Sequence, residues 1–444
     1  MKQKTYKYIM DNKFILKLFY YGLRVVPNSK KIIKYKNIIK NLNDIVDKNT
    51  ILLSNPINTR IAPIAVCNYG CLFCEIHKDN LLYPSRSKNI MNLKQYKNYE
   101  SFLATTYNLS FYGGSEEPLL NSHFGEIVQY LKSKYGIKMM VNTNASTMNE
   151  KLSNILVEYG FDDILISYHA ATEDGYLKLM TGDINKINKN IEYLQNLKKN
   201  KNTKLPIIKF NFALHKENLS EAIPVLDKAK EYDIDYVLAN KYYGGRNKLQ
   251  DKLVSYEYDL ENGKKELDKI YQYANDNNIR LIPSTPDYWK EYENITWNTN
   301  NYNKNKKCFE PWKSIHFNPV LSNKDSHYIG VCNRIELFRI DYSKLDLSNQ
   351  KDFEKIWNHP ILQYMRKTVN SEDINPICKY CKNYDRETIR NTDSNKYAEV
   401  RDNAVEEFLL YCHNNLISED IDGLEVLKEN PSSDRKFLEK LKEL

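Results

Sequence analysis

The sequence lacks any apolar run that could cross a membrane, because such a run needs about 18 uninterrupted apolar residues. The best candidate, residues 14–26, is interrupted by Lys17 and Arg24. A signal peptide is not expected either, since Lys17 breaks its apolar region and no small-residue cleavage site follows. These absences predict a cytoplasmic protein, in which thiols stay reduced. Its eight cysteines are therefore interpreted as metal ligands or core residues and not as disulfides.

Acidic residues are scarce at the N-terminus. Residues 1–48 contain twelve Lys or Arg and three Asp, a net charge of +9, against +8 for the whole chain. Because the basic charge does not extend over the rest of the chain, no nucleic-acid partner is expected. Residues 13–26 combine apolar residues with three basic ones. Two interpretations of this segment stay open: a helical collar on the main domain, or a weak contact with an anionic membrane surface that would make the protein peripheral.

Short apolar runs rich in β-branched or aromatic residues alternate with longer amphipathic stretches, which is the pattern of strands and helices in turn. The runs span residues 61–66, 109–112, 138–142, 164–169, 207–214 and 236–240. Residues 173–197 are predicted as one long helix, with an acidic start and a lysine-rich end. Six strands that alternate with helices predict an α/β fold with a parallel sheet, open or curled into a partial barrel. Functional groups are then expected at the carboxyl ends of the strands.

The chain is predicted to divide into four parts. Residues 1–60 are a basic helical N-terminal extension, and residues 61–293 are the α/β core. From residue 294 the alternation of strands and helices is lost. A linker rich in Asn, Lys and Tyr leads into a smaller cysteine-bearing domain, residues 294–390, which is followed by a helical tail, residues 391–444.

A loop after the first predicted strand reads Cys67-Asn-Tyr-Gly-Cys71-Leu-Phe-Cys74. Three thiolates at this spacing can bind three corners of a cubane cluster, which leaves the fourth iron open to an exogenous chelating molecule. A zinc site is the alternative, and His77 could supply its fourth ligand.

The Cys-x3-Cys-x2-Cys pattern, with the aromatic Phe73 before the last cysteine, resembles the signature of the radical S-adenosylmethionine (SAM) superfamily. The resemblance implies a partial (β/α)6 barrel that binds a 4Fe-4S cluster and SAM. Segment 111–120 resembles the family's motif for the methionine amino group and supplies candidate SAM ligands. They are Gly113, Gly114, Ser115, Glu116 and Glu117. Glu116 stands where the family often has Gly, so both glutamates remain candidates for the contact.

Three further matches follow later strands of the core. Asn144 ends the third strand as the family's Thr-Asn-Gly segment does, with Ala145 in place of Gly. Ser167 ends the fourth strand, where a family serine contacts the ribose or methionine part of SAM. Lys178 occupies the approximate place of a basic residue for the methionine carboxylate. Taken singly, Asn144 and Ser167 are also explained as strand-end caps, and Lys178 as part of a solvated helix face.

A second set of cysteines lies in the C-terminal half of the chain: Cys308, Cys332, Cys378 and Cys381. The neighbouring Pro-Trp312 and Trp357-Asn-His-Pro sequences, with Arg366, resemble the SPASM or shorter twitch extension of radical SAM enzymes. That resemblance implies one fully ligated auxiliary 4Fe-4S cluster, because a full SPASM region for two clusters needs more than these four cysteines. A four-cysteine zinc ribbon stays open as the alternative. Cys412, in a helical apolar run, is interpreted as a core residue.

The reaction implied by the resemblance is hydrogen abstraction by a 5′-deoxyadenosyl radical, formed when a flavodoxin- or ferredoxin-type donor reduces the cluster. The auxiliary cluster would accept the second electron of a dehydrogenation, while a side chain at the end of the sixth strand removes the proton. Candidates for that side chain are Lys241, Tyr242, Tyr243 and Arg246.

The preferred hypothesis for the substrate is a carbohydrate, cyclitol or related small molecule that is dehydrogenated. The alternative is maturation of a ribosomal peptide by crosslinking, epimerisation or thioether formation. The first 60 residues are too few and too helical for the leader-binding winged-helix module of many peptide-modifying members, which favours the small molecule. A non-enzymatic iron–sulfur or zinc scaffold is disfavoured by the ordered set of SAM motifs.

Overall fold

The structure is a computed structural model that describes residues 29–74, 90–112, 116–241, 260–283, 308–318, 327–330, 338–341, 345–379, 408 and 425–426. Within these residues the strands form one sheet in the order β11-β10-β9-β8-β1-β2-β3-β4-β5-β6-β7. The strands from β8 through β1 to β7 are parallel to their neighbours, whereas β8 to β11 are joined antiparallel. The strands are β1 (Asn58–Ile61), β2 (Asn108–Phe111), β3 (Lys138–Thr143), β4 (Asp163–Ser167), β5 (Ile207–Leu214), β6 (Tyr236–Lys241), β7 (Leu281–Pro283), β8 (Ser314–Asn318), β9 (His327–Gly330), β10 (Phe338–Asp341) and β11 (Glu425–Val426).

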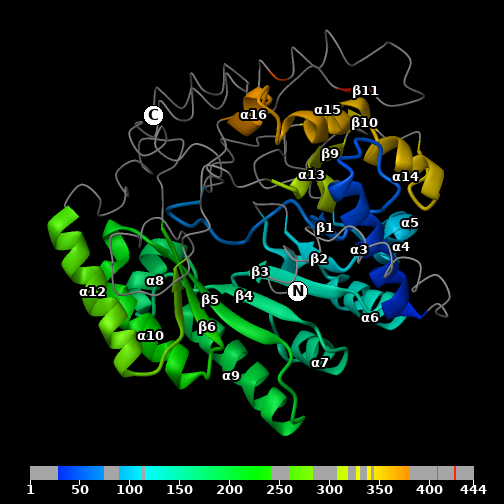
Figure 1. Cartoon of the computed structure of the whole chain (residues 1–444). Helices are drawn as coiled ribbons and strands as arrows, with labels where there is room; N and C mark the ends of the chain where they lie inside the picture. The colour runs from blue at the N-terminus through cyan, green and yellow to red at the C-terminus, as the bar shows by residue number, and fades with distance from the viewer. Residues whose placement is uncertain are drawn as a thin grey trace.

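Helices connect the parallel strands and cover one face of the sheet (Figure 1). In the core they are α4 (Leu93–Lys97), α5 (Glu100–Leu103), η1 (Pro118–Leu120), α6 (Phe124–Tyr135), α7 (Glu150–Glu158), α8 (Glu173–Met180), α9 (Ile184–Asn200), η2 (Lys216–Glu221), α10 (Ala222–Glu231) and α12 (Leu260–Asp276). The covered face is apolar: Phe111 of β2 is fully buried and packs edge-on against Phe124 of α6, with ring centroids 4.8 Å apart. Burial of each such side chain contributes about 1.5–3 kcal/mol to folding.

The opposite face of the parallel strands is polar and half-buried. The register pairs Arg60 with Ser110 and Ser167 with Asn211. Paired residues in neighbouring strands point to the same face, and Asn142 joins them by the two-residue alternation of β3. All five side chains are of intermediate exposure, in contrast to the fully buried residues between them.

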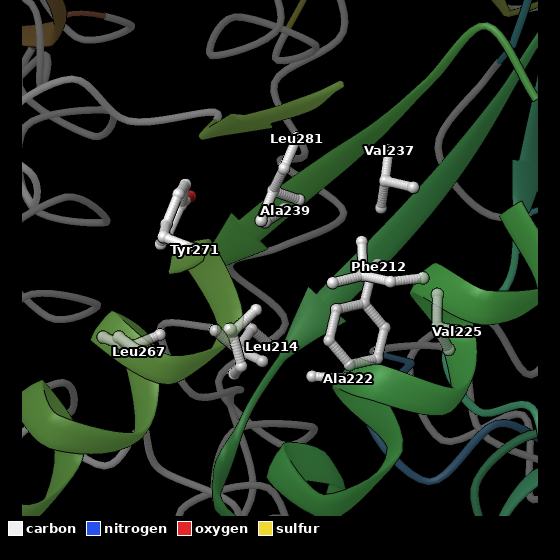
Figure 2. A pocket seen from close by; sticks show the side chains of 11 residues that line it. Phe212, Leu214, Ala222, Val225, Val237, Ala239, Leu267, Tyr271 and Leu281 are labelled. Atoms are coloured by element: carbon white, nitrogen blue, oxygen red, sulfur yellow. The ribbon is translucent and has the colours of Figure 1, made fainter. Parts of the chain in front are cut away.

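A small apolar pocket lies on the helix-covered face, between β5, β6 and β7 on one side and α10 and α12 on the other. Figure 2 shows Phe212, Leu214 and Leu267 among the side chains that line it. Its lining carries almost no hydrogen-bonding group, and it does not include any of the predicted site residues. We interpret it as a packing gap of the core.

The predicted α/β class with a parallel sheet is confirmed, and several boundaries are corrected. The first strand is β1, residues 58–61, and not 61–66, because Pro63 has no N–H to donate to a ladder and the chain turns away from the sheet there. The predicted helix 173–197 is wrong: α8 ends at Met180, and Asp183 caps the start of α9 by accepting from the backbone N–H groups of residues 185 and 186. Strand β7 extends the parallel sheet beyond the six predicted strands.

The ends of the chain are described in part. Helix α3 (Lys30–Val46) precedes the core, while residues 13–26 and the linker 294–307 lie outside the described residues. The tail was predicted to be helical, but Glu425–Val426 form β11, which pairs with β10. In the described part of the chain, no helix is long and apolar enough to span a bilayer.

The C-terminal helices are α13 (Glu310–Lys313), α14 (Gln350–Trp357), α15 (Pro360–Thr368) and α16 (Pro376–Lys379). Side chains of α13, α14 and α15 donate hydrogen bonds to the segment between α3 and β1. Trp312 donates its indole N–H to the carbonyl of Asn49, and Trp357 donates to that of Ser54, both at 2.8 Å. The Pro-Trp and Trp-Asn sequences are thus accounted for by tertiary contacts of their own side chains.

Candidate active site

The three closely spaced cysteines lie on the loop that follows β1, at the carboxyl end of the parallel strands. The loop is tight, since the backbone N–H of Cys74 donates to the carbonyl of Cys71 at 3.1 Å. Cys67 is exposed, Cys71 and Cys74 are half-buried, and all three are thiols rather than halves of disulfides. The sequence prediction that these cysteines share one loop is consistent with this placement.

Although residue 67 is exposed as a whole, the protein around its sulfur desolvates the Cys67 thiol, and together with the nearby Glu117 and Cys74 this raises its pKa to about 11. Burial also raises the pKa of Cys71 well above its usual value, with added repulsion from Cys74 and Cys67. The three sulfurs are therefore within electrostatic reach of one another, and a bound cationic iron centre would reverse the shifts by stabilising the thiolates. As a donor set the loop fits a cluster with three cysteine ligands.

The three thiols of the loop do not converge on a single point. In the ranges that the structure describes, no three His, Cys, Asp or Glu side chains stand close enough to hold a metal ion. Ligation by the loop therefore requires rotation of the thiols toward a common centre, which is within the reach of three cysteines on one short loop.

Asn144, at the end of β3, lies directly beside the loop. Its side-chain amide donates to the Asn68 side chain at 3.0 Å and stands 4.0 Å from the Cys67 sulfur. Asn68 in turn donates to the Ser146 hydroxyl at 2.9 Å. Asn144 thus contacts the residue that follows the first cysteine, a role that the spacing pattern alone does not reveal.

Glu117 is almost fully buried and is held by the protein itself. Its carboxylate accepts hydrogen bonds from the Thr143 hydroxyl, from the backbone N–H of Asn144 at 2.6 Å and from that of Leu119 at 3.1 Å. Burial raises the pKa of Glu117 to about 7, against the effect of these three donors. Glu116 is half-buried, and Gly113, Gly114 and Ser115 lie outside the described residues.

Phe73 packs against two histidines that the sequence did not single out. Its ring is edge-on to His169 with centroids 4.6 Å apart, and tilted against His215 at 5.6 Å. Burial lowers the pKa of His169 to about 3 and that of His215 to about 4, so both imidazoles are neutral. They follow β4 and β5, and their position at strand ends was the one available signal.

The other predicted SAM and proton-transfer residues are less closely grouped. Ser167 ends β4, and Lys178 on α8 forms an ion pair with Glu217 at 2.9 Å, its side chain 60% exposed. Lys241 ends β6, but its side chain is outside the described part. Tyr242, Tyr243 and Arg246 also lie outside it.

Two members of the second cysteine set are described. Asn370 brackets Cys308 by accepting from its backbone N–H at 2.9 Å and donating to its carbonyl at 2.7 Å. Asn370 follows α15 on the segment that leads to Cys378, which is buried. Cys332, Cys381 and Cys412 lie outside the described residues.

A parallel sheet with a three-thiol loop after its first strand defines an α/β core suited to an iron–sulfur cluster, and residues 61–229 match the model of the radical SAM superfamily. Two curated relatives are each named probable GTP 3′,8-cyclase, one from Metallosphaera sedula and one from Sulfurisphaera tokodaii. They are 24% and 28% identical over 180 residues, which are 40% of this chain and 52% and 53% of the relatives. The chain therefore spans about half the length of the curated relatives it matches.

Solved structures share the fold over more of the chain. Streptococcus suis SuiB bound to S-adenosylmethionine aligns with a TM-score of 0.54 and 16% identity, over 80% of this chain and 79% of SuiB. SuiB bound to its precursor peptide SuiA aligns with a TM-score of 0.52 and 16% identity, over 75% and 71%. At this identity the likeness is one of fold. The match to a radical SAM domain therefore rests on the superfamily model over residues 61–229.

Proposed function

We propose that the protein is a radical SAM oxidoreductase whose SAM-binding 4Fe-4S cluster is held by Cys67, Cys71 and Cys74. The observation that carries the proposal is the three-thiol loop directly after β1, inside the segment that matches the superfamily. When bound, the cluster and SAM supply a 5′-deoxyadenosyl radical that takes a hydrogen atom from an unactivated C–H bond. The chain's own part is to bind and orient the reactants and to exclude water.

Each candidate residue around the cysteine loop is assigned a part of SAM or of the cluster loop to bind. We assign the methionine amino group to Glu116 with Gly113, Gly114 and Ser115, because the Glu117 carboxylate already accepts three hydrogen bonds within the protein. Phe73 offers an apolar ring backed by neutral histidines. Ser167 and Lys178 are assigned to the ribose or methionine part and to the carboxylate. Asn144 supports the cluster loop.

We further propose one auxiliary 4Fe-4S cluster held by Cys308, Cys332, Cys378 and Cys381. The bracket of Asn370 around Cys308 supports this assignment, since it brings Cys308 to the segment that leads to Cys378. Lys241, Tyr242 and Arg246 are the candidate proton acceptors at the end of β6. A flavodoxin- or ferredoxin-type protein is the proposed electron donor.

For the substrate we favour a carbohydrate, cyclitol or related small molecule that is dehydrogenated. The half-buried polar face of the sheet supports this class, because Ser110, Asn142 and Asn211 offer donors and acceptors suited to hydroxyl groups. A peptide substrate is the second candidate, favoured by the fold shared with SuiB, which is described in complex with its precursor peptide.

The decisive experiment is anaerobic reconstitution with iron counting and an assay for 5′-deoxyadenosine. The wild-type chain should hold about eight irons, from two cubanes of four, and replacing Cys67, Cys71 and Cys74 by Ala together should leave about half. Cys71→Ala should abolish release of 5′-deoxyadenosine, whereas the control Cys412→Ser should retain it. Unaltered SAM cleavage in Cys71→Ala, or stoichiometric zinc in place of iron, would contradict the proposal.

A further inference from the structure

The residues between the cysteines rest on the turn that joins α8 to α9. The backbone N–H of Gly70 donates to the Thr181 hydroxyl at 2.8 Å, and that of Leu72 donates to the Leu179 carbonyl at 2.9 Å. The Cys71 sulfur lies 3.6 Å from the thioether sulfur of Met180. Three consecutive residues of the loop therefore contact this turn, and Cys71 is the middle one.

Thr181 adopts a backbone conformation that its side chain disfavours. Its φ of 58° and ψ of 23° lie in the left-handed region, where a β-branched residue is an outlier. Glycine would suit this position far better. Backbone strain of this kind persists where the surrounding structure requires it, and it gathers at functional sites. Here the side chain that glycine would lack is the one that accepts the Gly70 hydrogen bond.

Gly182, the next residue, is required by a close approach. A Cβ atom built there would stand 2.3–2.6 Å from ring atoms of Tyr69, far inside van der Waals contact. The Tyr69 ring therefore lies directly on this glycine, and it also meets Tyr176 of α8 edge-on, with ring centroids 6.4 Å apart. The Thr181 side chain therefore binds the loop, and the missing side chain of Gly182 leaves room for the Tyr69 ring.

We propose that the turn of residues 179–182 is a positioning seat for the cysteine loop, in which Thr181 and Gly182 hold Cys71 and its neighbours in place before any cluster is bound. Both are positioning residues, since they act through the loop. Their importance for the reaction rests on the proposed function, but the placement of the loop does not.

The test uses the metal-free full-length chain, with iodoacetamide labelling of individual cysteines followed by mass spectrometry. Thr181→Gly removes the hydroxyl and relieves the backbone strain. We expect Cys71 to label about fivefold faster, which corresponds to the net contribution of roughly one hydrogen bond. The thermal midpoint should stay level or rise, because the backbone strain is relieved. Thr181→Ser keeps the hydroxyl and should label like the wild type. Buried Cys378 is the internal reference for general opening of the chain.

Two results would overturn the seat. One is unchanged Cys71 labelling in Thr181→Gly; the other is an equal increase at Cys378, which would indicate loosening of the whole chain. Gly182→Ala supplies an independent test, because the added methyl must displace Tyr69 and should also speed Cys71 labelling. In reconstituted protein, both variants should release iron to a chelator faster than Thr181→Ser. If even the wild type takes up no iron, the proposed function fails, while the labelling still decides the seat.

Discussion

At the scale of single residues, Glu117 connects two strand ends beside the cysteine loop through hydrogen bonds. Its carboxylate joins the segment after β2 to the end of β3 by accepting from Thr143 and Asn144. The neighbouring Asn144 side chain then reaches Asn68 in the cysteine loop. Three donors point at this almost fully buried carboxylate and stabilise its charge above its pKa of about 7.

At about pH 8, above the Glu117 pKa of about 7, we predict that Glu117→Gln lowers the free energy of unfolding by about 2–3 kcal/mol. A hydrogen bond to a charged group is lost, and the amide N–H₂ must face another donor. Urea denaturation of the metal-free chain measures the change. Glu116→Gln, at the half-buried neighbour, is the matched control and should change stability by less than about 0.5 kcal/mol. Equal losses in the two variants would show that Glu117 has no special structural role.

The candidate site was only partly predictable from residues in sequence. The cysteine loop could be found because its three thiols are fixed by local spacing, which needs no knowledge of the fold. The hydrogen bonds that hold Glu117 could not, since one of them comes from Thr143, more than twenty residues away. Thr181 and Gly182 were likewise invisible, because their meaning arises from contacts with a loop more than a hundred residues distant.

At the scale of elements, the strands were more predictable than the helix boundaries. Runs of β-branched residues located β2 to β6 within one or two residues, because alternation with buried neighbours imposes a strong pattern. The break between α8 and α9 was missed, since apolar residues recur at helical spacing on both sides of it. Thr181, Gly182 and Asp183 stop one helix and start the next, and that turn supports the site.

At the same scale, Arg366 of α15 connects the C-terminal helices to the segment before β1 through hydrogen bonds. Its guanidinium donates to the carbonyls of Pro311, Thr50 and Trp357 at 2.7–2.9 Å. It also stacks on the Trp357 ring, 4.6 Å from the ring centroid. The planar group with five donors suits this task, which the single ammonium of a lysine cannot perform.

We predict that Arg366→Met destabilises the chain by about 3 kcal/mol or more, roughly one for each carbonyl left buried without a donor. Urea denaturation gives the magnitude, and hydrogen exchange should show faster exchange over residues 49–54. Lys367→Met, on the same helix but exposed, is the control and should have little effect. Unchanged exchange over residues 49–54 would mean that Arg366 does not stabilise this segment.

At the scale of the whole molecule, buried histidines should make the free energy of unfolding fall at acid pH. Burial lowers the pKa of His169 and His316 to about 3, and that of His215 and His359 to about 4. Each is neutral in the folded chain and gains a proton more readily when unfolded. His169 and His215 follow strands of the parallel core, His316 lies in β8 and His359 caps the start of α15. Acid should therefore destabilise the core and the C-terminal helices together.

His359 allows the clearest test of this acid sensitivity. It is 1% exposed, its Nδ1 accepts from the backbone N–H of Ile361 at the start of α15, and within the described residues its buried Nε2 has no hydrogen-bond partner. Its folded pKa of about 4 lies below the ordinary value of 6.5. Between these values the unfolded chain binds more protons, so stability is full above the window and falls as the pH falls through it.

We predict that His359 accounts for about 2 kcal/mol of the stability lost between roughly pH 7 and pH 5. His359→Asn retains an acceptor for the Ile361 N–H but cannot titrate, so its urea midpoint should fall less over this interval than that of the wild type. The variant starts from a somewhat lower stability, because the smaller side chain leaves a cavity. The comparison is therefore made on the pH dependence within each protein, and identical slopes for the two would show that His359 is protonated without cost in the folded state.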